Sequence, residues 1–380
     1  MSPLSFGNHI PGLWAWFDVV IRIAIVTLVM TVIVMYLTYG ERKFVARVQQ
    51  RLGPMRTGPW GLFQAIADTF KLLTKEDLRP AQADRWVFEL APYVTFVPVL
   101  MVLVTLPFAK DWGVRNLSLG MFYVFAALGL NIVGILMAGL GSGNKYALLG
   151  GLRAAAQMIS YEIPLVLSLI SVAMIAQTLD LNVITELQHR RPFIVLQPLA
   201  FVIFYTAMLS ELHRAPFDIP VAESEIVGGF FIEYSGIRWS MFQLTEYGSM
   251  FAWSVFGSVV FLGGWEWPWG GDVGWGYQLF LTFLKSFIWI ASILWVRATV
   301  PRLRIDQLMA FSWKVLLPLV LLQFLMNGFI LVYGWPEELL FATSSIGAAG
   351  LIGFIVMRGL YRPKSPSLVG AYKQPQGSSA

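Results

Sequence analysis

The amino-acid sequence predicts an all-α polytopic membrane protein with about nine transmembrane helices and an amphipathic helix on the cytoplasmic membrane surface. The prediction rests on an apolar composition, on long uncharged runs, and on an uneven distribution of Lys and Arg. Of the 380 residues, 57% are hydrophobic and 13% are charged, whereas charged residues make up about 25% of an ordinary soluble domain. A chain of this composition is expected to fold in lipid.

Apolar runs of membrane-spanning length recur along the chain, since one helical crossing needs roughly 20 residues. The expected spans lie near residues 19–39, 90–108, 120–140, 159–178, 193–212, 246–264, 277–297, 315–334 and 340–358. They predict one integral-membrane domain over residues 1–362. The tail at 363–380 is rich in Pro, Ser and Gly and is expected to be disordered.

The basic residues predict the orientation, because short loops rich in Lys and Arg stay in the cytoplasm. The odd-numbered loops and the C-terminus, counted with Arg297 and Arg358 at the ends of their spans, hold 21 Lys and Arg, against 4 in the N-terminus and the even-numbered loops. This places the N-terminus outside and the C-terminus in the cytoplasm, with a bacterial plasma membrane as the expected location. The first span is too long for a signal-peptide core and is expected to remain in the mature protein. The positive charge therefore indicates topology and not nucleic-acid binding.

Redox and nucleotide cofactors have no recognisable site in the sequence. The chain has no cysteine, which excludes an iron–sulfur cluster held by thiolates and a disulfide. Its histidines, His9, His189 and His213, lie outside the expected spans or at their edge, which disfavours a haem between two membrane histidines. The glycine-rich segment 139–151 lacks the Ser or Thr that follows the lysine of a phosphate loop. No metal site is expected.

Loop one, residues 40–89, contains the expected amphipathic helix. Its two faces share the helical period, one apolar (Leu62, Phe63, Ile66, Phe70, Leu73) and one polar (Gln64, Asp68, Lys71, Lys75). Such a helix lies along a membrane surface. Asp68 and Lys71, three residues apart, are alternatively an ordinary pair on a solvated helix face.

The segment before this helix is strongly basic, with five cations just past the first span: Arg42, Lys43, Arg47, Arg51 and Arg56. These cations either bind anionic lipid or neutralise an acidic surface on a neighbouring subunit. The sequence leaves both interpretations open.

Loop five carries acids on the side of the membrane where cations are expected. Its carboxylates are Glu211, Asp218, Glu223, Glu225 and Glu233, and Arg214 is the cation among them. Two prolines keep the middle of the loop out of regular helix. This pattern indicates a proton-coupling or docking role for the acids.

Four ionisable residues are expected at membrane depth or at the end of a span: Glu162, Glu211, Glu246 and Lys285. A charge there costs roughly 2.5 to 3.5 kcal/mol on insertion scales. The carboxylates either carry protons or form ion pairs that fix the helix packing.

Two long segments, ERKFVARVQQRLGPMRTGPWGLFQAIADTFKLLTKED and ELHRAPFDIPVAESEIVGGFFIEYSGIRW, resemble one family of membrane subunits of proton-pumping NADH:quinone oxidoreductase, respiratory complex I. The family is designated H in bacteria and corresponds to subunit 1 in mitochondria. ISYEIPL, LTEY and WVRATVPRLRIDQLM follow the same pattern in the same order. The resemblance implies eight core membrane helices, an interfacial helix and, in some bacterial members, a ninth span.

The resemblance also implies a function. The chain would form part of a quinone chamber, bind no cofactor itself, and couple quinone reduction to proton translocation. NADH, FMN and iron–sulfur clusters would belong to peripheral-arm partner subunits, and other membrane-arm subunits would lie beside the chain.

The implied site residues fall into two groups. The proton-coupling group is Asp68, Lys71, Glu162, Glu211, Asp218, Glu223, Glu225, Glu233 and Glu246. The quinone-chamber group is Arg42, Arg51, Arg297 and Arg302.

The sequence departs from the family pattern at two positions, Gly129 and Val221, where many members carry glutamate. A proton relay through the position of Gly129 needs water or another side chain such as Asn131. Three alternatives also stay open: a subunit of a related energy-converting hydrogenase, a stand-alone ion transporter, and a purely structural anchor for the peripheral arm. The transporter is disfavoured because the sequence shows no inverted repeat.

Overall fold

The computed structural model describes residues 13–110, 112–189, 191–221, 226–266 and 274–360. Within these residues the regular elements are helical, apart from one isolated bridge between Ala109 and Trp112. In chain order the α-helices are α1 (Leu13–Val48), α2 (Gln64–Thr74), α3 (Arg85–Thr105), α4 (Gly120–Gly141), α5 (Lys145–Ala176), α6 (Leu181–Leu187), α7 (Phe193–Leu196), α8 (Pro198–Glu211), α10 (Gly236–Leu262), α11 (Trp275–Thr299), α12 (Ile305–Phe311), α13 (Leu317–Val332) and α14 (Glu337–Leu360).

The predicted fold class is confirmed. By length and composition, seven helices in the described part of the chain are able to cross a membrane, and α8 is a shorter apolar helix. The long helix α10 carries Arg238 and Glu246 in its first half and is not among the seven. The count of nine crossings therefore stays a prediction, and the expected tail lies outside the described residues.

Several helices extend beyond the expected spans. The first, α1, continues to Val48 through the GERK segment, which was expected to begin a loop. The single Gly40 does not break it, because good helix formers follow and no proline intervenes. Helix α5 likewise begins at Lys145, where the Asn144 side chain caps it by accepting the Tyr146 N–H.

The expected fifth span is broken. Helix α7 ends at Leu196 and α8 begins at Pro198, with Gln197 in a non-helical conformation between them. The Ser344 hydroxyl on α14 accepts the Leu199 N–H at 3.0 Å and so caps α8 from another helix. The break is thus covered by the C-terminal helix.

A buried amide network surrounds this break. Gln197 Oε1 accepts hydrogen bonds from Ser171 Oγ at 2.7 Å and from Gln323 Nε2 at 3.2 Å. Ser171 in turn accepts from Asn327 Nδ2 at 3.3 Å. The network ties α5, the α7–α8 break and α13 together inside the bundle. It pairs only part of the buried amides, since Gln197 Nε2, Gln323 Oε1 and Asn327 Oδ1 have no hydrogen-bond partner among the described residues.

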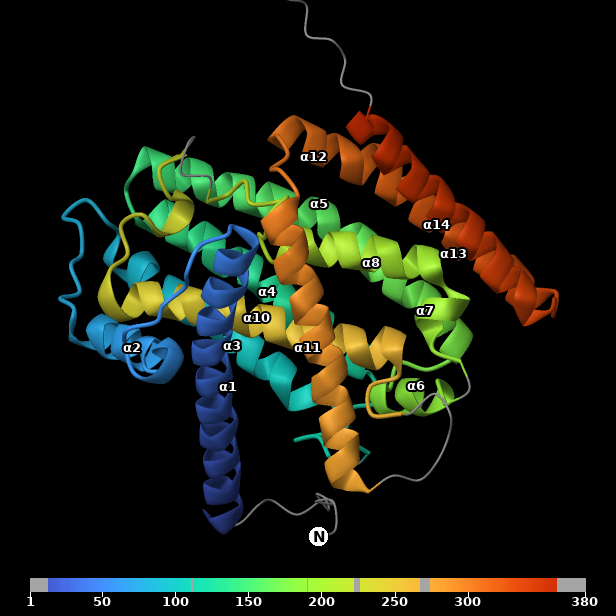
Figure 1. Cartoon of the computed structure of the whole chain (residues 1–380), viewed down its shortest axis with the longest axis horizontal. Helices are drawn as coiled ribbons and strands as arrows, with labels where there is room; N and C mark the ends of the chain where they lie inside the picture. Colours follow the sequence, from blue (N-terminus) through green and yellow to red (C-terminus); the bar gives the residue numbers. More distant parts are fainter. Residues whose placement is uncertain (1–12, 111, 190, 222–225, 267–273, 361–380) are drawn as a thin grey trace, which may run out of the picture.

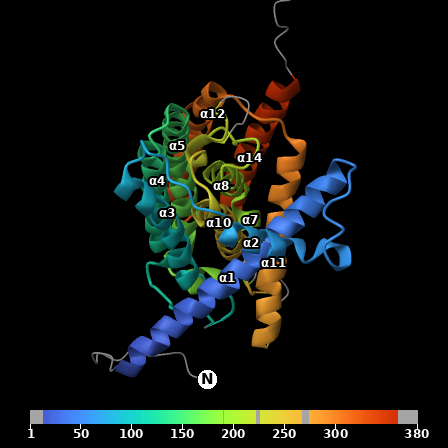
Figure 2. The ribbon, with the colours of Figure 1, turned by 90° about the vertical axis from the view of Figure 1, so that its left-hand side faces the viewer.

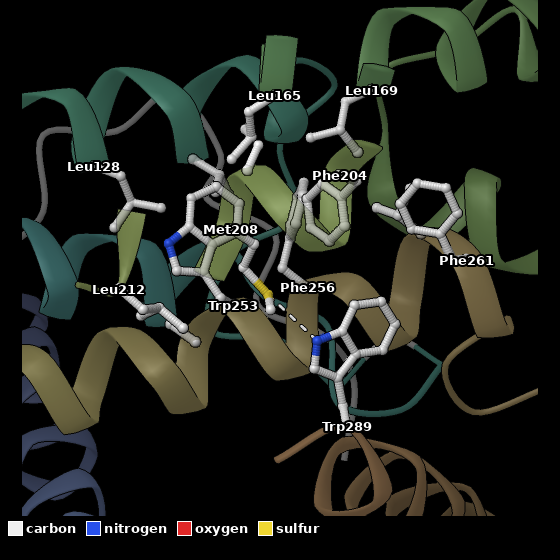
Figure 3. Close-up of a cluster of buried hydrophobic side chains, with 14 of the residues drawn as sticks. Leu128, Leu165, Leu169, Phe204, Met208, Leu212, Trp253, Phe256, Phe261 and Trp289 are labelled. Carbon is white, nitrogen blue, oxygen red and sulfur yellow. Dashed lines mark hydrogen bonds between the residues drawn. The ribbon is translucent and has the colours of Figure 1, made fainter. Parts of the chain in front are cut away.

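The bundle is arranged with α1 and α11 crossing one side and with α13 and α14 along an edge (Figure 1). Figure 2 shows α1 as a long diagonal helix that reaches past the other elements. The core between α5, α8, α10 and α11 is aromatic (Figure 3). There the rings of Phe204 and Phe261 lie 5.1 Å apart, and Trp289 Nε1 donates to Met208 Sδ at 3.3 Å.

Close helix contacts depend on glycine. A Cβ atom at Gly134 on α4 would lie 2.8 Å from the Thr95 backbone nitrogen of α3. A Cβ at Gly139 would lie 3.1 Å from the Gly151 Cα of α5. Small residues let membrane helices approach this closely, so α3, α4 and α5 form a tight layer. This layer brings α4, which carries Asn131, against α5, which carries Glu162.

We predict that Gly134→Ala destabilises the chain by about 1 to 3 kcal/mol, because the new methyl group would press against the backbone of α3. Thermal unfolding of the purified membrane assembly measures the effect. Gly350→Ala on α14 is the matched control, since a Cβ there meets nothing within 4 Å. Equal melting temperatures for the two variants would contradict the prediction.

Candidate functional site

One buried carboxylate, Glu41, joins segments that are far apart in the sequence. Glu41 lies on α1 and is 6% exposed, and Arg214, just past α8, is 5% exposed. Arg214 Nη1 lies 3.3 Å from Glu41 Oε2, and Arg297 on α11 pairs with Glu41 Oε1. We call Glu41, Arg214, Glu246, Tyr247 and Arg297 the Glu41 cluster.

Helix α10 completes the cluster. The Arg214 guanidinium lies over the Tyr247 ring, 4.5 Å from its centroid, and Arg214 Nη2 is 4.0 Å from Glu246 Oε2. A cation over an aromatic face is favourable, more so when desolvated. The cluster therefore alternates carboxylate and guanidinium groups from α1, α10, α11 and the loop after α8.

A second ion pair lies beside the cluster. Arg302 Nη2 is 3.1 Å from Asp218 Oδ2, and the Leu303 backbone N–H donates to the Pro216 carbonyl at 3.0 Å. These contacts join loop five to the segment between α11 and α12. Two of the predicted chamber arginines, Arg297 and Arg302, are thus each bound to a carboxylate at this end of the bundle.

Asp68 on α2 is held by α1. Arg42 Nη1 lies 2.6 Å from Asp68 Oδ2, Gln64 Nε2 donates to Asp68 Oδ1 at 3.2 Å, and Lys71 Nζ is 3.5 Å away. Partial burial raises the pKa of Asp68, but the hydrogen bond and charge of Arg42, with help from Gln64 and Lys71, outweigh it and hold the pKa below its usual value. Asp68 thus remains ionised and fixes α2 to α1.

A small cavity of about 20 Å³, lined by both apolar and polar side chains, lies between α3, α4, α10 and the end of α8. Glu211, Glu246, His213, Asn131 and Ser249 are among its lining residues. Four atoms that belong to these residues have no hydrogen-bond partner among the described residues: Glu211 Oε2, His213 Nε2, Asn131 Oδ1 and Ser249 Oγ. A cavity of this size has room for about one water molecule.

His213 lines the cavity from the start of loop five. It lies outside the expected span 193–212, has a left-handed backbone conformation (φ 48°), and is 8% exposed. Burial, together with the neighbouring charge of Arg214, lowers the pKa of His213 to about 4. The imidazole is therefore neutral at physiological pH.

Glu162 on α5 lies opposite the position of the first departure from the family pattern. A Cβ atom at Gly129 on α4 would come within 3.1 Å of Glu162 Oε1. A carboxylate at that position would therefore be adjacent to Glu162. Val221, the second departure, packs beside the apolar cluster that contains Phe230.

Other predicted site residues lie apart from the cluster. The Glu233 carboxylate accepts from Asn144 Nδ2 at 2.6 Å, near the start of α5. Arg51 is exposed and donates to Gln49 Oε1 at 2.7 Å. Glu223 and Glu225 lie outside the described residues.

Glu41 was not among the residues predicted for the site, and neither was His213. The signal for Glu41 is its position at the end of the first span, as an acid directly before a run of basic residues. The signal for His213 is its place between Glu211 and Arg214. Among the described residues, no group of three His, Asp or Glu side chains is arranged to hold a metal ion.

Comparison with known proteins gives consistent matches. Residues 21–328 match the family model described as NADH dehydrogenase. The chain is 42% identical over 342 residues to the NADH-quinone oxidoreductase subunit designated H of Dehalococcoides mccartyi, covering 90% of this chain and 95% of that protein. It is 45% identical over 327 residues to the protein of the same name from Geobacillus kaustophilus, covering 83% and 95%. These matches confirm the family resemblance that the loop segments indicate.

We predict that Arg214→Gln destabilises the chain by about 3 to 5 kcal/mol, because it breaks a buried ion pair and leaves Glu41 with less compensation. The measurement is the melting temperature and yield of the assembly. Arg85→Gln is the control, since Arg85 is exposed and lies 3.8 Å from Glu89, where a pair contributes about 1 kcal/mol or less. Adding Glu41→Gln to Arg214→Gln should restore part of the loss.

We predict that His213 makes stability depend on pH between about 6.5 and about 4. The unfolded chain binds a proton at His213 as the pH falls through about 6.5, whereas the folded chain resists protonation until about 4. Stability is therefore highest above pH 6.5 and falls by up to about 3 kcal/mol as the pH approaches 4.

The measurement is the melting temperature between pH 7.5 and pH 4.5 for the wild type and for His213→Asn. Asparagine tolerates the left-handed conformation and does not titrate in this range. A variant that loses as much stability as the wild type over this interval would refute the assignment.

Proposed function

This chain belongs to the NADH dehydrogenase family, and on that premise we propose that it is the membrane subunit of a NADH-quinone oxidoreductase. In this role it forms part of the quinone chamber and couples quinone reduction to proton translocation. It is an enzyme subunit without a complete active site of its own. The proposal rests above all on the ionic connection from the exposed end of α11 to the carboxylates of the inner cavity.

That connection is continuous in space. Arg297 has a side chain 34% exposed and pairs with the buried Glu41, which pairs with Arg214. Arg214 reaches Glu246, and Glu246 and Glu211 line the same cavity. Charges close together in a poorly hydrated interior act on one another strongly. A change of charge near Arg297 therefore changes the electrostatic potential at Glu246 and Glu211.

Arg42 on α1, Arg297 at the end of α11 and Arg302 just after α11 would border the quinone chamber. Quinone carbonyl oxygens accept hydrogen bonds, and guanidinium groups are rigid donors suited to them. Arg42, Arg297 and Arg302 keep exposed side-chain area of 56%, 34% and 51% while they hold carboxylates. Arg51 would border the chamber from the segment after α1.

Quinone reduction creates a demand for protons, because electrons arriving from the peripheral arm make the quinone oxygens basic. In the proposed coupling, this change acts first on the Glu41 cluster and on Asp218, Glu223, Glu225 and Glu233 of loop five. Glu246 and Glu211 then exchange protons through the cavity that both line, and Glu162 continues the route inward. Asp68 and Lys71 connect the interfacial helix α2 to the same change of charge on quinone reduction.

The wider setting follows from the same proposal. The chain is a multi-pass membrane protein of about nine spans, with its N-terminus outside and its C-terminus in the cytoplasm of a bacterial cell. Partner subunits in the peripheral arm would hold NADH, FMN and iron–sulfur clusters, and further membrane-arm subunits would pack against the bundle. Membrane lipid covers the apolar exterior.

The alternatives have less support. The relatives that match at 42% and 45% identity are named for quinone reduction, which disfavours a hydrogenase-type complex. A structural anchor does not need a buried carboxylate oxygen such as Glu211 Oε2, beside a cavity, to lack a hydrogen-bond partner among the described residues. Neighbouring genes for quinone-module or hydrogenase subunits would separate the first alternative directly.

We predict that Glu211→Gln lowers proton translocation coupled to quinone reduction by about tenfold or more, because glutamine cannot take up and release a proton. Quinone reduction and proton translocation are measured together in the assembled complex reconstituted in vesicles. Glu186→Gln is the control, since Glu186 is an exposed carboxylate paired with Lys110 at 3.3 Å. Wild-type rates for both reactions in Glu211→Gln would remove this residue from the coupling route.

A further inference from the structure

We propose that a hollow between α2 and the beginning of α10 binds the phosphate headgroup of an anionic phospholipid. The hollow has a volume of about 470 Å³, within the range of roughly 300 to 1,000 Å³ typical of ligand sites. Lys71, Leu72 and Lys75 line it from α2, and Tyr234 and Trp239 line it from the other side. Figure 1 shows α2 beside the start of α10.

The charge of the hollow favours an anion. Lys71 and Lys75 are both exposed, and Lys75 forms no ion pair among the described residues. Asp68 is shared by Arg42 at 2.6 Å and Lys71 at 3.5 Å, and Asp77 is paired with Arg238 at 3.0 Å. The single charge of Asp68 therefore leaves Lys71 only partly compensated, and Lys75 remains the uncompensated cation of the hollow. Glu76 follows Lys75 in the chain but does not line the hollow.

The surroundings of the hollow favour a lipid over a free anion. On α2 and just before it, Phe63, Phe70 and Leu73 are 53%, 64% and 56% exposed, as expected for a helix whose apolar face enters a membrane. Trp is favoured at the level of lipid headgroups, and the half-buried Trp239 lines the hollow. A lipid bound there places its phosphate against the lysines of the polar face and its glycerol backbone against Leu72, the apolar residue of α2 that lines the hollow, and its chains extend from there toward the apolar face of α2.

The backbone keeps the hollow open. Gly236 has φ 54°, and a Cβ atom there would lie 3.0 Å from the Lys75 carbonyl oxygen. The Ser235 hydroxyl donates to the Glu76 carbonyl at 3.3 Å and accepts the Leu78 N–H at 3.2 Å. These contacts fix the end of α2 against the start of α10. The backbone positions of Lys71 and Lys75 are therefore fixed relative to α10.

The test uses the whole complex reconstituted with phosphatidylglycerol or phosphatidylcholine that carries a photoreactive diazirine next to the acyl ester. After illumination, mass spectrometry measures labelling of the peptides that contain residues 71–75 and 234–239. We expect phosphatidylglycerol to label these peptides more than phosphatidylcholine does. Lys75→Gln should reduce its labelling about fivefold, while Lys75→Arg should retain it.

Lys145→Gln is the matched control, because Lys145 lies on α5 and does not line the hollow; it should leave the labelling unchanged. Equal labelling by the two lipids, or labelling that survives Lys75→Gln, would overturn the proposal. Displacement of the label by millimolar inorganic phosphate would assign the hollow to a free anion, and displacement by a short-chain quinone would assign it to the substrate path. The readout needs no turnover, so it is independent of the proposed proton coupling.

Discussion

The arrangement of the site depends on the burial of Glu41 beside Arg214. Removing these charges from water costs several kcal/mol for each ion, and only close pairing offsets that cost. Because Glu41 also binds Arg297, the pairing requirement fixes α1, the end of α8 and α11 relative to one another. The position of Arg214 over Tyr247 then sets where Glu246 lies. The geometry of the inner cavity therefore follows from an electrostatic constraint at one end of the bundle.

Close helix packing supplies the other half of the site. Membrane helices gain little from hydrophobic association in lipid and depend on tight contacts and interhelical hydrogen bonds. The glycines of α4 permit such contacts with α3 and α5, and Gln157 on α5 donates at 2.8 Å to the carbonyls of both Ser210 and Phe217. The Gln157 amide thus binds the backbone before and after the proline-containing turn of loop five, while Glu41 binds the Arg214 side chain within it. Loop five is therefore fixed at both ends of its proline-containing turn.

The sequence predicted the fold class and the family because both are expressed in local patterns. Hydropathy marks the helices, and the two loop segments carry the resemblance without any knowledge of contacts. The sequence also identified Glu211, Glu246 and Asp218 as related residues. It did not identify Glu41, whose partner Arg214 is 173 positions away, because no local pattern encodes that pairing. It also grouped Glu233 with the other acids, although Asn144 holds Glu233 elsewhere, since adjacency in a loop says little about the direction of side chains.

The cap that Ser344 provides for α8 has a consequence for biosynthesis. The Leu199 amide belongs to the middle of the chain, while its acceptor is translated much later. Until α14 emerges from the ribosome, the Leu199 N–H lacks its Ser344 acceptor. A lipid, a transient water molecule or the insertion machinery must then accept its hydrogen bond. Maturation of the bundle is thus completed from its C-terminal end, and a prematurely terminated product would retain an unsealed defect in its interior.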